Sequence, residues 1–317
     1  MSFSLLSERV DNLYKFILRR FIQSIGVLLA VSLIIFTMLQ LTGDPIELML
    51  GEEGTQQDEI RLRKALGLDK SIPLQYGLFL KNALQGNLGI SYHHGVPAME
   101  LVLERVPATL ELVGFSMLFA ILISIPLGVY AASKRGKFRD RAILSCSLIG
   151  ISAPPFWVGI VCILFFSVAL GWLPTSGRGG LEHLILPAGS LALYRIALFI
   201  RLIRSGMLDV LNQEYILTAH SKGLSEKIVF YKHALKNTLI PFITIGGLQM
   251  GSLFAGAIVT ERIFAWPGMG RLILDSIQKL DYPVVMCWAL ITACIFIVIN
   301  LIVDISYSFV DPRIRAN

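Results

Sequence analysis

The sequence predicts an all-α protein that crosses a membrane several times. Hydrophobic residues make up 55% of its 317 residues and charged residues only 16%, whereas soluble domains carry about 25% charged residues. The mean hydropathy is +0.68. The chain also contains several uncharged windows of the length that a helix needs to cross a hydrocarbon core about 30 Å thick. This composition excludes a soluble enzyme and a disordered chain.

Six membrane spans are expected. Five of them contain a long uncharged stretch, whereas the fourth carries Arg195 and Arg201. Arg201 can extend its charge to the membrane edge, but Arg195 lies near the middle of the span, which is costly unless it faces protein or water. The fourth span is retained because the basic segments on either side of it would otherwise face opposite sides of the membrane. The expected spans lie near residues 21–43, 106–131, 142–170, 185–203, 239–260 and 282–304.

The distribution of Lys and Arg predicts the orientation, because cytoplasmic loops are enriched in these residues. With the N-terminus inside, the inner segments hold 17 of the 28 cations in 81 residues, and the outer segments hold 10 in 102 residues. The short loop 132–141 is the clearest signal, with five cations. Both termini are therefore expected in the cytoplasm.

Two loops are long enough to have structure of their own. Residues 42–105 are expected outside, as a periplasmic loop with one or two short amphipathic helices. This loop is either a small cap or a solvated, partly ordered segment. The second long loop, residues 204–238, is expected in the cytoplasm and is helical by pattern.

A glycine divides the cytoplasmic loop into two helices. The first is predicted to end near Lys222, with Gly223 as its cap residue. Ser225 can cap the second helix, whose apolar stripe is expected at Leu224, Ile228, Tyr231 and Leu235. The resulting elbow, with apolar Ala219 and Leu224 beside it, is either a docking knob for a partner or a hairpin packed on its own membrane domain.

Candidate residues for a translocation pathway lie at helix breaks and at polar positions inside the spans. Pro154 and Pro155 interrupt the third span, either to line a pathway or as a packing kink. Arg195 either lines water or pairs with Glu111 or another helix. Asn300, in the last span, is the fourth candidate.

The sequence contains none of the common catalytic or nucleotide-binding motifs. There is no G-x-x-x-x-G-K-[ST] loop, no H-E-x-x-H and no G-x-S-x-G, and the four cysteines have no metal-ligand spacing. We therefore expect no catalytic residues, no metal site and no cofactor in this chain, so any energy source must be supplied elsewhere. An intramembrane enzyme is disfavoured, and the elbow favours a subunit with partners over an autonomous channel or secondary carrier.

Residues 214–241, which read EYILTAHSKGLSEKIVFYKHALKNTLIP, resemble the EAA loop of importer-type ABC permeases. The most similar group is the dipeptide/oligopeptide/nickel permease family. The resemblance spans almost the whole chain, because further family blocks occur in order. They include IPLGVYAASKRGKFRDR (125–141), SAPPFW (152–157), LGWLPTSG (170–177) and ERIFAWPGMGR (261–271).

The resemblance implies the six-span fold of type I ABC importer permeases in the bacterial inner membrane. It further implies a second, homologous permease subunit, two ATP-binding subunits that hold ATP and Mg, and a periplasmic solute-binding protein, with no role for nucleic acid. The implied solutes are di- or oligopeptides, with nickel chelates or glutathione-type compounds as the alternative.

In this family the elbow is a coupling helix that sits in a groove of the ATPase. Ala219 and Gly223 match the last alanine and the glycine of the motif, whereas Leu217 replaces its usual glutamate and Lys236 stands where the general motif has proline. These departures leave open which side chains contact the ATPase. The coupling residues expected from the resemblance are Glu214, Ala219, His220, Lys222, Gly223, Leu224 and Ser225.

Overall fold

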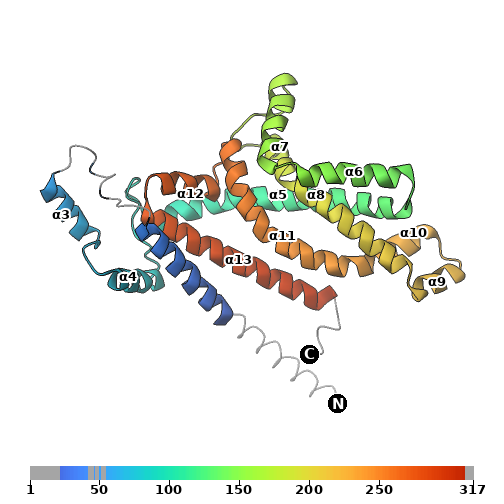
Figure 1. The fold of residues 1–317 in the computed structure, drawn as a ribbon, viewed down its shortest axis with the longest axis horizontal. Helices are drawn as coiled ribbons and strands as arrows, with labels where there is room; N and C mark the ends of the chain where they lie inside the picture. The colour runs from blue at the N-terminus through green and yellow to red at the C-terminus, as the bar shows by residue number, and fades with distance from the viewer. Residues whose placement is uncertain (1–21, 42–45, 47–49, 51–54, 311–317) are drawn as a thin grey trace, which may run out of the picture. The chain divides into compact units, whose positions relative to one another are not determined.

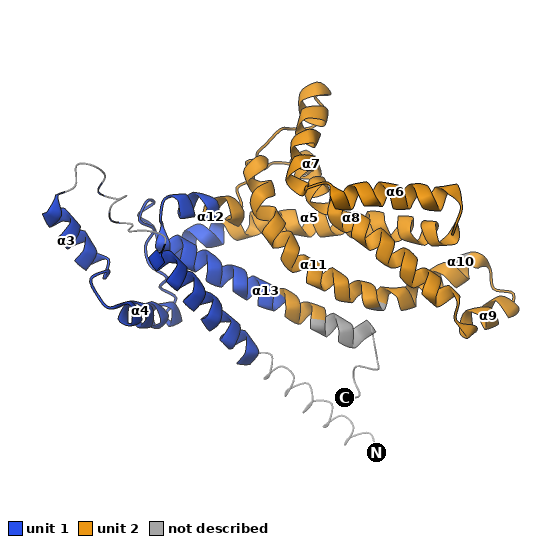
Figure 2. Ribbon diagram, viewed as in Figure 1, with its two compact units in different colours: residues 1–104, 273–298 blue, residues 105–272, 299–317 orange. Residues whose placement is uncertain are grey.

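The structure is a computed structural model that describes residues 22–41, 46, 50 and 55–310. These residues are helical or lie in turns and connections, with one isolated β-bridge between Ile90 and Pro97. The chain forms two compact units, residues 1–104 with 273–298 and residues 105–272 with 299–317 (Figure 2). The predicted all-α membrane fold is confirmed.

The described helices follow one another along the chain as Figure 1 shows. In order they are an N-terminal span Ile22–Leu41, α3 Gln56–Ala65, α4 Ile72–Leu84, α5 Ala98–Ser133, α6 Phe138–Ser152, α7 Pro155–Cys162, η2 Ile163–Ala169, α8 Leu181–Leu211, α9 Glu214–Ser221, α10 Glu226–Ile228, η3 Val229–Ala234, α11 Leu235–Ile263, α12 Met269–Gln278 and α13 Tyr282–Val310.

In the first unit, α4 is tied to the N-terminal span by side chains. The hydroxyls of Ser32 and Tyr76 lie 2.9 Å apart, and the amide of Gln40 donates to Gln75 at 2.9 Å. The loop 42–105, in which one or two short helices were expected, contains the two short helices α3 and α4.

A buried carboxylate joins the turn before α5 to the start of α13. Asp281 is 1% exposed and accepts hydrogen bonds from the Ser91 hydroxyl and from the backbone N–H of Tyr92, the latter at 3.2 Å. Because a buried carboxylate is stable only when it is paired or hydrogen-bonded, these bonds fix the 91–92 turn to residue 281.

In the second unit, α8 is the central helix, packed against α6, α7 and α11. Phe199, Ile203 and Met207 of α8 are fully buried and join a cluster that includes Phe242 of α11. The rings of Phe199 and Phe242 meet edge to face, with centroids 4.9 Å apart. The apolar face of α8 thus supplies much of the core against which neighbouring helices pack.

Five helices are long and apolar enough to cross a membrane, and a sixth crossing results if α6 and the α7–η2 segment form one broken span. They overlap the six expected ranges, although several are longer: α5 has 36 residues and α8 has 31. The membrane boundaries of the spans and the side on which the termini lie stay predictions.

The chain bends by 102° between α6 and the α7–η2 segment, between Ser152 and Pro155. Ala153 and Pro154 are both extended, with ψ angles of 123° and 133°. A residue that precedes proline is disfavoured in the helical region, and two consecutive prolines impose this restriction twice. The sequence expectation of a break at Pro154–Pro155 is confirmed, and its role in a pathway stays a prediction.

Candidate functional site

The elbow, residues 214–234, begins with a break that the sequence analysis missed. We expected one helix to continue to about Lys222, but α8 ends at Leu211 and α9 begins at Glu214. Gln213 is extended, and its carbonyl accepts from the N–H of Ile216 at 3.0 Å, which starts the new helix. The signal was Asn212, because the short amide side chain of asparagine competes with helical hydrogen bonds.

The far end of α9 is closed by a left-handed glycine. Gly223 has φ +75°, its N–H donates to the carbonyl of His220 at 2.9 Å, and the N–H of Leu224 donates to the carbonyl of Ala219 at 3.4 Å. This pair of bonds is a Schellman motif, which satisfies helix-end carbonyls when a glycine takes a left-handed conformation. The predicted helix end near Lys222 is confirmed.

The second arm of the elbow starts at Ser225 but is not capped by its hydroxyl. Ser225 is extended, and its carbonyl accepts from the N–H groups of Ile228 and Val229, whereas its side chain makes no capping bond. The helical turn of α10 passes directly into the π-helix η3. In Figure 1 these arms lie beside α9, at the end of α8 and α11.

The expected apolar stripe is confirmed at its ends, where Leu224 and Leu235 pack against the core cluster, and is wrong at its centre. Ile228 and Tyr231 are 42% and 56% exposed, whereas Val229 and Ala234 are fully buried. The backbone bonds of a π-helix join residues five positions apart, which is the spacing between Val229 and Ala234, so its wider turn changes which side chains face the core. The stripe was predicted with a period of 3.6 residues, so its central members were placed on the wrong face.

The two faces of α9 differ sharply in exposure. Ile216 and Ala219 are 1% and 7% exposed and belong to the core cluster around α8, whereas Leu217 is 70% exposed. At Ala219, one of the expected coupling residues, the structure favours the alternative of a hairpin packed on its own domain, because its methyl group joins that cluster. Leu224 is also partly buried against that cluster.

The other expected coupling residues lie at the surface. They are Glu214, His220, Lys222, Gly223 and Ser225. Together with Leu217 they give the elbow an exposed leucine surrounded by polar groups. The sequence analysis did not include Leu217 among the contact candidates, although its departure from the family glutamate was a signal.

A side-chain bond connects the elbow to the following long helix. The amide of Asn237 on α11 donates to the hydroxyl oxygen of Tyr215 on α9 at 2.5 Å. Together with the buried Ile216 and Ala219, this bond attaches α9 to the ends of both α8 and α11. A displacement of α9 would therefore be carried to two long helices.

Arg195, on α8, is buried at 5% exposure. Its Nη2 donates to the Ser252 hydroxyl on α11 at 2.9 Å and its Nη1 to the carbonyl of Leu191 at 3.3 Å, while its Nε has no partner. Within the described part of the chain, no carboxylate forms an ion pair with it. The pairing with Glu111 that was left open is wrong, because Glu111 binds Arg178 at 2.6 Å.

The remaining pathway candidates lie on other elements. Pro154 and Pro155 precede and begin α7, with Pro154 exposed and Pro155 partly buried. Asn300 lies on α13 and is partly buried. No group of three or more His, Cys, Asp or Glu side chains that could hold a metal is found among the described residues.

One buried network escaped sequence reasoning. The carboxylate of Glu261, 0% exposed, accepts from the Thr109 hydroxyl at 2.6 Å and from the backbone N–H groups of Gly270 and Arg271 at 2.7 and 3.1 Å. It joins α5, the end of α11 and the start of α12. The sequence carried no signal for this network beyond a single carboxylate at the end of the apolar stretch 237–260.

The comparisons with known proteins agree over nearly the whole chain. The family model described as binding-protein-dependent transport system inner membrane component matches residues 124–316, and the model of the N-terminal component matches residues 13–113. Each of three curated relatives is matched over 94% or 95% of this chain.

These relatives are transport permeases. An oligopeptide transport system permease protein of Bacillus subtilis is 42% identical, with 99% of its own length covered. A dipeptide transport system permease protein of Alkalihalophilus pseudofirmus is 38% identical, with 98% covered. A glutathione transport system permease protein of Escherichia coli is 39% identical, with 98% covered.

A solved structure supports the same fold. A chain of the MetNI methionine ABC transporter in inward-facing conformations aligns with a TM-score of 0.55 and 18% identity, over 67% of this chain and 97% of that chain. The helical multi-pass architecture, the matched family models and the near full-length relatives lead to one assignment. The chain belongs to the family of inner membrane components of binding-protein-dependent transport systems, the ABC importer permeases.

Proposed function

We propose that this chain is the transmembrane permease subunit of an ATP-driven importer for di- or oligopeptides. It forms the pathway together with a second, homologous permease subunit. Two ATP-binding subunits hydrolyse ATP with Mg, and a periplasmic binding protein delivers the solute. The peptide assignment is supported by the names of the relatives from Bacillus and Alkalihalophilus.

In this proposal both termini and the elbow lie on the cytoplasmic side, and residues 42–105 lie on the periplasmic side. The excess of Lys and Arg in the segments 1–20, 132–141 and 201–238 supports this orientation. The elbow is then on the side where ATP is available.

The observation that carries the proposal is the division of α9 into a buried and an exposed face. Ile216 and Ala219 anchor the helix to its own domain, while Leu217 points its side chain to the surface. This face of the elbow has an apolar centre, Leu217, and a polar rim that extends from Glu214 and His220 to Ser225. Such a surface is suited to binding in a groove of a partner protein. We therefore assign the ATPase contact to this face.

Coupling then follows from the attachment of the elbow. ATP binding closes the two ATPase subunits, and the groove carries α9 with it. Because α9 is bonded to α11 through Tyr215 and Asn237 and packs on the cluster around α8, the long helices move as rigid bodies between two states. Each state must make different contacts with the ATPases, since otherwise ATP would not shift the equilibrium.

For the pathway we propose Arg195, with the bend at Pro154 and Pro155 and with Asn300 of α13. A buried cation inside a membrane span without a carboxylate partner is a functional candidate. Arg195 reaches an exposed Ser252 on α11, so its guanidinium edge lies next to the surface of that helix. Peptides carry a C-terminal carboxylate that such a group can attract.

The proposal is tested first by isolating the complex. The tagged chain is solubilised gently from its native host, and stoichiometric partners are identified by mass spectrometry. Recovery of a second permease and ATPase subunits is expected. Recovery of the chain alone, active after reconstitution without ATP, would instead support an autonomous channel or carrier.

The coupling role is tested with two matched glycines. Gly223 and Gly136 both have φ +75°, and a Cβ atom on either meets no atom within 4 Å. Alanine at either position introduces a left-handed strain of about 1–2 kcal/mol. We expect Gly223→Ala, and more strongly Gly223→Pro, to lower solute uptake per ATP hydrolysed, while Gly136→Ala leaves this ratio unchanged.

An equal effect of the two alanine variants on that ratio would refute the special role of the elbow. Membrane insertion of each variant is checked by its amount in the membrane fraction.

Glutathione-type solutes are the second candidate, because a glutathione transport permease of Escherichia coli is 39% identical to the chain. Binding measurements on the solute-binding protein of the same transporter distinguish the two kinds of solute. Nickel chelates are a further arm of the same measurement.

A further inference from the structure

A cavity of about 430 Å³ lies within the first unit. Its walls come from the end of the N-terminal span, from α3 and α4 with their connection, from residues 87–92 and from the start of α13. Ligand sites for small molecules are typically hollows of about 300–1,000 Å³. The cavity is therefore large enough to hold the head and neighbouring atoms of an amphipathic molecule.

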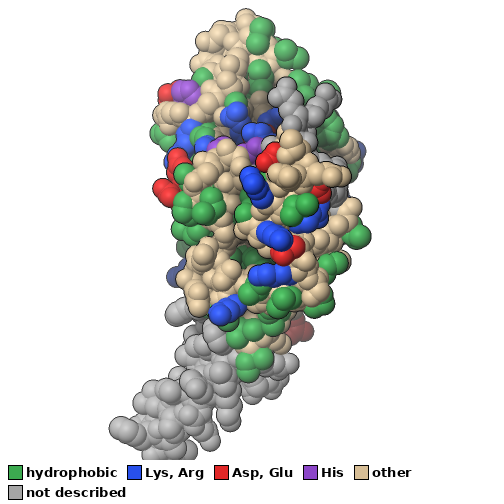
Figure 3. Space-filling model, turned by 90° about the vertical axis from the view of Figure 1, so that its left-hand side faces the viewer, with side chains coloured by type: hydrophobic (Ala, Val, Ile, Leu, Met, Phe, Trp, Pro, Cys, Tyr) green, Lys and Arg blue, Asp and Glu red, His purple; other side chains and the backbone are tan. Residues whose placement is uncertain are grey.

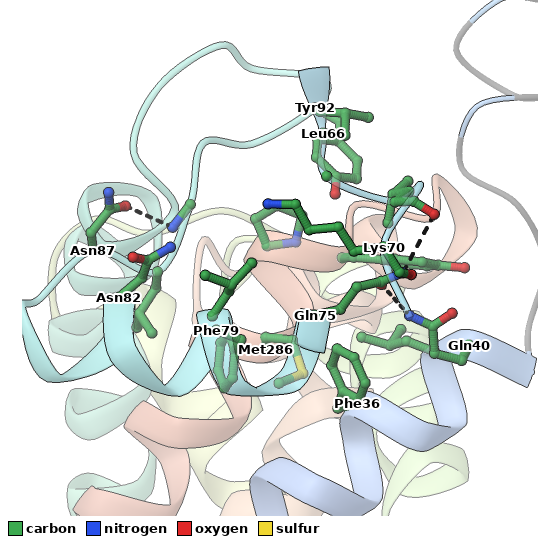
Figure 4. A pocket seen from close by; sticks show the side chains of 18 of the residues that line it. Phe36, Gln40, Leu66, Lys70, Gln75, Phe79, Asn82, Asn87, Tyr92 and Met286 are labelled. Carbon is green, nitrogen blue, oxygen red and sulfur yellow. Dashed lines mark hydrogen bonds between the residues drawn. The ribbon is translucent and has the colours of Figure 1, made fainter. Parts of the chain in front are cut away.

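The floor of the cavity is apolar and aromatic. Figure 4 shows Phe36 of the N-terminal span, Phe79 of α4 and Met286 of α13 along one side, and Tyr92 and Leu66 on the opposite side. Phe36 also packs on Tyr76, with ring centroids 5.3 Å apart. Hydrocarbon fits this floor better than a fully charged solute does, because burying apolar area is favourable and burying an unpaired charge is not.

The rim of the cavity is cationic. Among the described residues that line it, the charged members are Lys64 and Lys70, and none is acidic. Both lysines are exposed, and within the described ranges neither forms an ion pair. On the side that carries α3 and α4, Lys and Arg side chains are prominent among the hydrophobic ones (Figure 3). The rim therefore attracts an anion.

The amide side chain of Gln75 holds the wall of the cavity together. The Gln75 amide donates to the carbonyl of Lys70 at 2.8 Å and accepts from Gln40 at 2.9 Å (Figure 4), so it holds the α3–α4 connection against the N-terminal span. Burial, helped by the charge of Asp281, raises the pKa of Tyr92 to about 12. Its hydroxyl stays protonated at neutral pH and is available as a hydrogen-bond donor.

The location of the cavity at the ends of two candidate spans indicates which kind of anion it binds. It is lined where one candidate span, Ile22–Leu41, ends and another, Tyr282–Val303, begins. Lysines and aromatic rings at span ends mark the interface between hydrocarbon and water. The N-terminal span also leaves large apolar side chains exposed, among them Leu33 and Met38 at 49% and 61%, which places lipid beside the cavity.

We propose that this cavity binds an anionic phospholipid, with the phosphate at Lys64 and Lys70 and the upper part of an acyl chain against Phe36, Phe79 and Met286. The bound lipid connects the α3–α4 loop to the ends of two spans. This site is distinct from the elbow and from Arg195, and it does not depend on which solute the transporter carries.

The test uses the whole transporter complex, reconstituted in nanodiscs with a phosphatidylglycerol that carries a photoreactive group on its acyl chain. After illumination, labelled peptides are located by mass spectrometry. Labelling of Phe36, Phe79 or Met286 is compared with labelling of Ile25 and Leu29, which are exposed on the N-terminal span. We expect the cavity residues to be labelled several-fold more than the exposed ones.

The double variant Lys64→Gln, Lys70→Gln is expected to lose this excess, while labelling of Ile25 and Leu29 stays unchanged. Lys81→Gln is the matched control, because Lys81 is exposed on α4 but does not line the cavity. Equal cavity labelling in the wild type and the double variant would overturn the proposal.

Competition distinguishes the lipid from soluble anions. Unlabelled phosphatidylglycerol is expected to reduce the cavity label, whereas inorganic phosphate and a soluble tripeptide are expected to leave it unchanged. Displacement by phosphate or by the tripeptide would reassign the cavity to a soluble ligand and overturn the lipid proposal. Labelling by a zwitterionic phosphatidylcholine probe as strong as that by phosphatidylglycerol would contradict the requirement for an anionic head.

Discussion

Two arginines on α8 are held by different kinds of partner. Arg204 is bound by the carboxylate of Asp140 through two bonds, of 2.6 and 2.8 Å, and Asp140 also accepts from the N–H of Gly136 at 2.9 Å. Arg195 is more deeply buried, at 5% exposed against 21% for the Arg204 side chain, but the partners of its guanidinium are a hydroxyl and a backbone carbonyl, and its Nε has none among the described residues. Both side chains occupy the same helix, nine residues apart.

The difference separates a structural tie from a functional candidate. Arg204 and Asp140 compensate each other's charge and fasten the start of α6 to α8. Arg195 keeps a buried charge that its surroundings do not neutralise, and such a charge lowers stability. A folded membrane protein that retains this cost has a use for the charge, which is the reason for placing Arg195 in the pathway.

The largest effect is expected when one member of the Arg204–Asp140 ion pair is removed. Asp140→Ala leaves the Arg204 guanidinium, whose side chain is 21% exposed, without its carboxylate. Because water can partly replace the lost bonds, we expect a loss of about 1.5–3 kcal/mol in the free energy of unfolding. Thermal unfolding of the detergent-solubilised complex measures this loss. The double variant Asp140→Leu, Arg204→Met removes both charges and is expected to recover much of the stability.

A single Asp140→Ala variant as stable as the wild type would show that the pair is not a structural tie. The contrast with Arg195 would then lose its basis.

The second variant acts on the uncompensated arginine. Arg195→Met removes a buried charge and keeps a long apolar side chain, so we expect unchanged or raised thermal stability. Uptake is expected to fall by about 10–100-fold, because a hydrogen bond to a charged group contributes roughly 1.5–3 kcal/mol. Uptake into vesicles and the melting temperature are measured on the same preparation.

Normal uptake by Arg195→Met would remove the residue from the pathway. A large loss of stability with proportionate loss of uptake would make it a structural residue like Arg204.

The elbow allows the same comparison between a buried and an exposed position. Ala219→Leu forces three additional carbon atoms into the core, and overpacking costs about 1–3 kcal/mol, so the melting temperature is expected to fall. Leu217→Ser changes an exposed side chain and is expected to leave stability unchanged while weakening ATPase association about tenfold or more, since a buried leucine contributes roughly 1.5–3 kcal/mol. The two variants would exchange their effects if the faces of α9 had been assigned the wrong way round.

The smallest effect is expected from Ser252→Ala, which tests how much the hydroxyl bonded to Arg195 contributes to transport. Ser252→Ala removes one hydrogen bond to the guanidinium. Because Ser252 is exposed, water can take the place of its hydroxyl, and we expect a net loss of about 0.5–1.5 kcal/mol rather than the full value of a bond to a charged group. Uptake is expected to fall by only a few-fold, with a greater fall at low solute concentration. An effect as large as that of Arg195→Met would mean that the hydroxyl, rather than the charge, is the group that the pathway needs.

The sequence predicted the helices better than the faces they bury. Uncharged windows predicted five of the six expected ranges, and the paired prolines predicted the bend, because both follow from local chemistry; the fourth range was retained from the charge of the segments beside it. The exposure of Tyr231 and the burial of Ala219 were not predicted. Both depend on the π-helix and on the core around α8, which form only when distant segments pack together.

The sequence by itself determined the membrane class, the helical content and the glycine turn at Gly223, since lipid requires closed backbone hydrogen bonding and a left-handed turn favours glycine. The tertiary structure alone decided the partners of the buried charges. It paired Arg204 with Asp140 and Glu111 with Arg178, and it left Arg195 without a described carboxylate. Ion pairs depend on distances of a few ångströms between residues up to 67 positions apart, and no local pattern in the sequence specifies such distances.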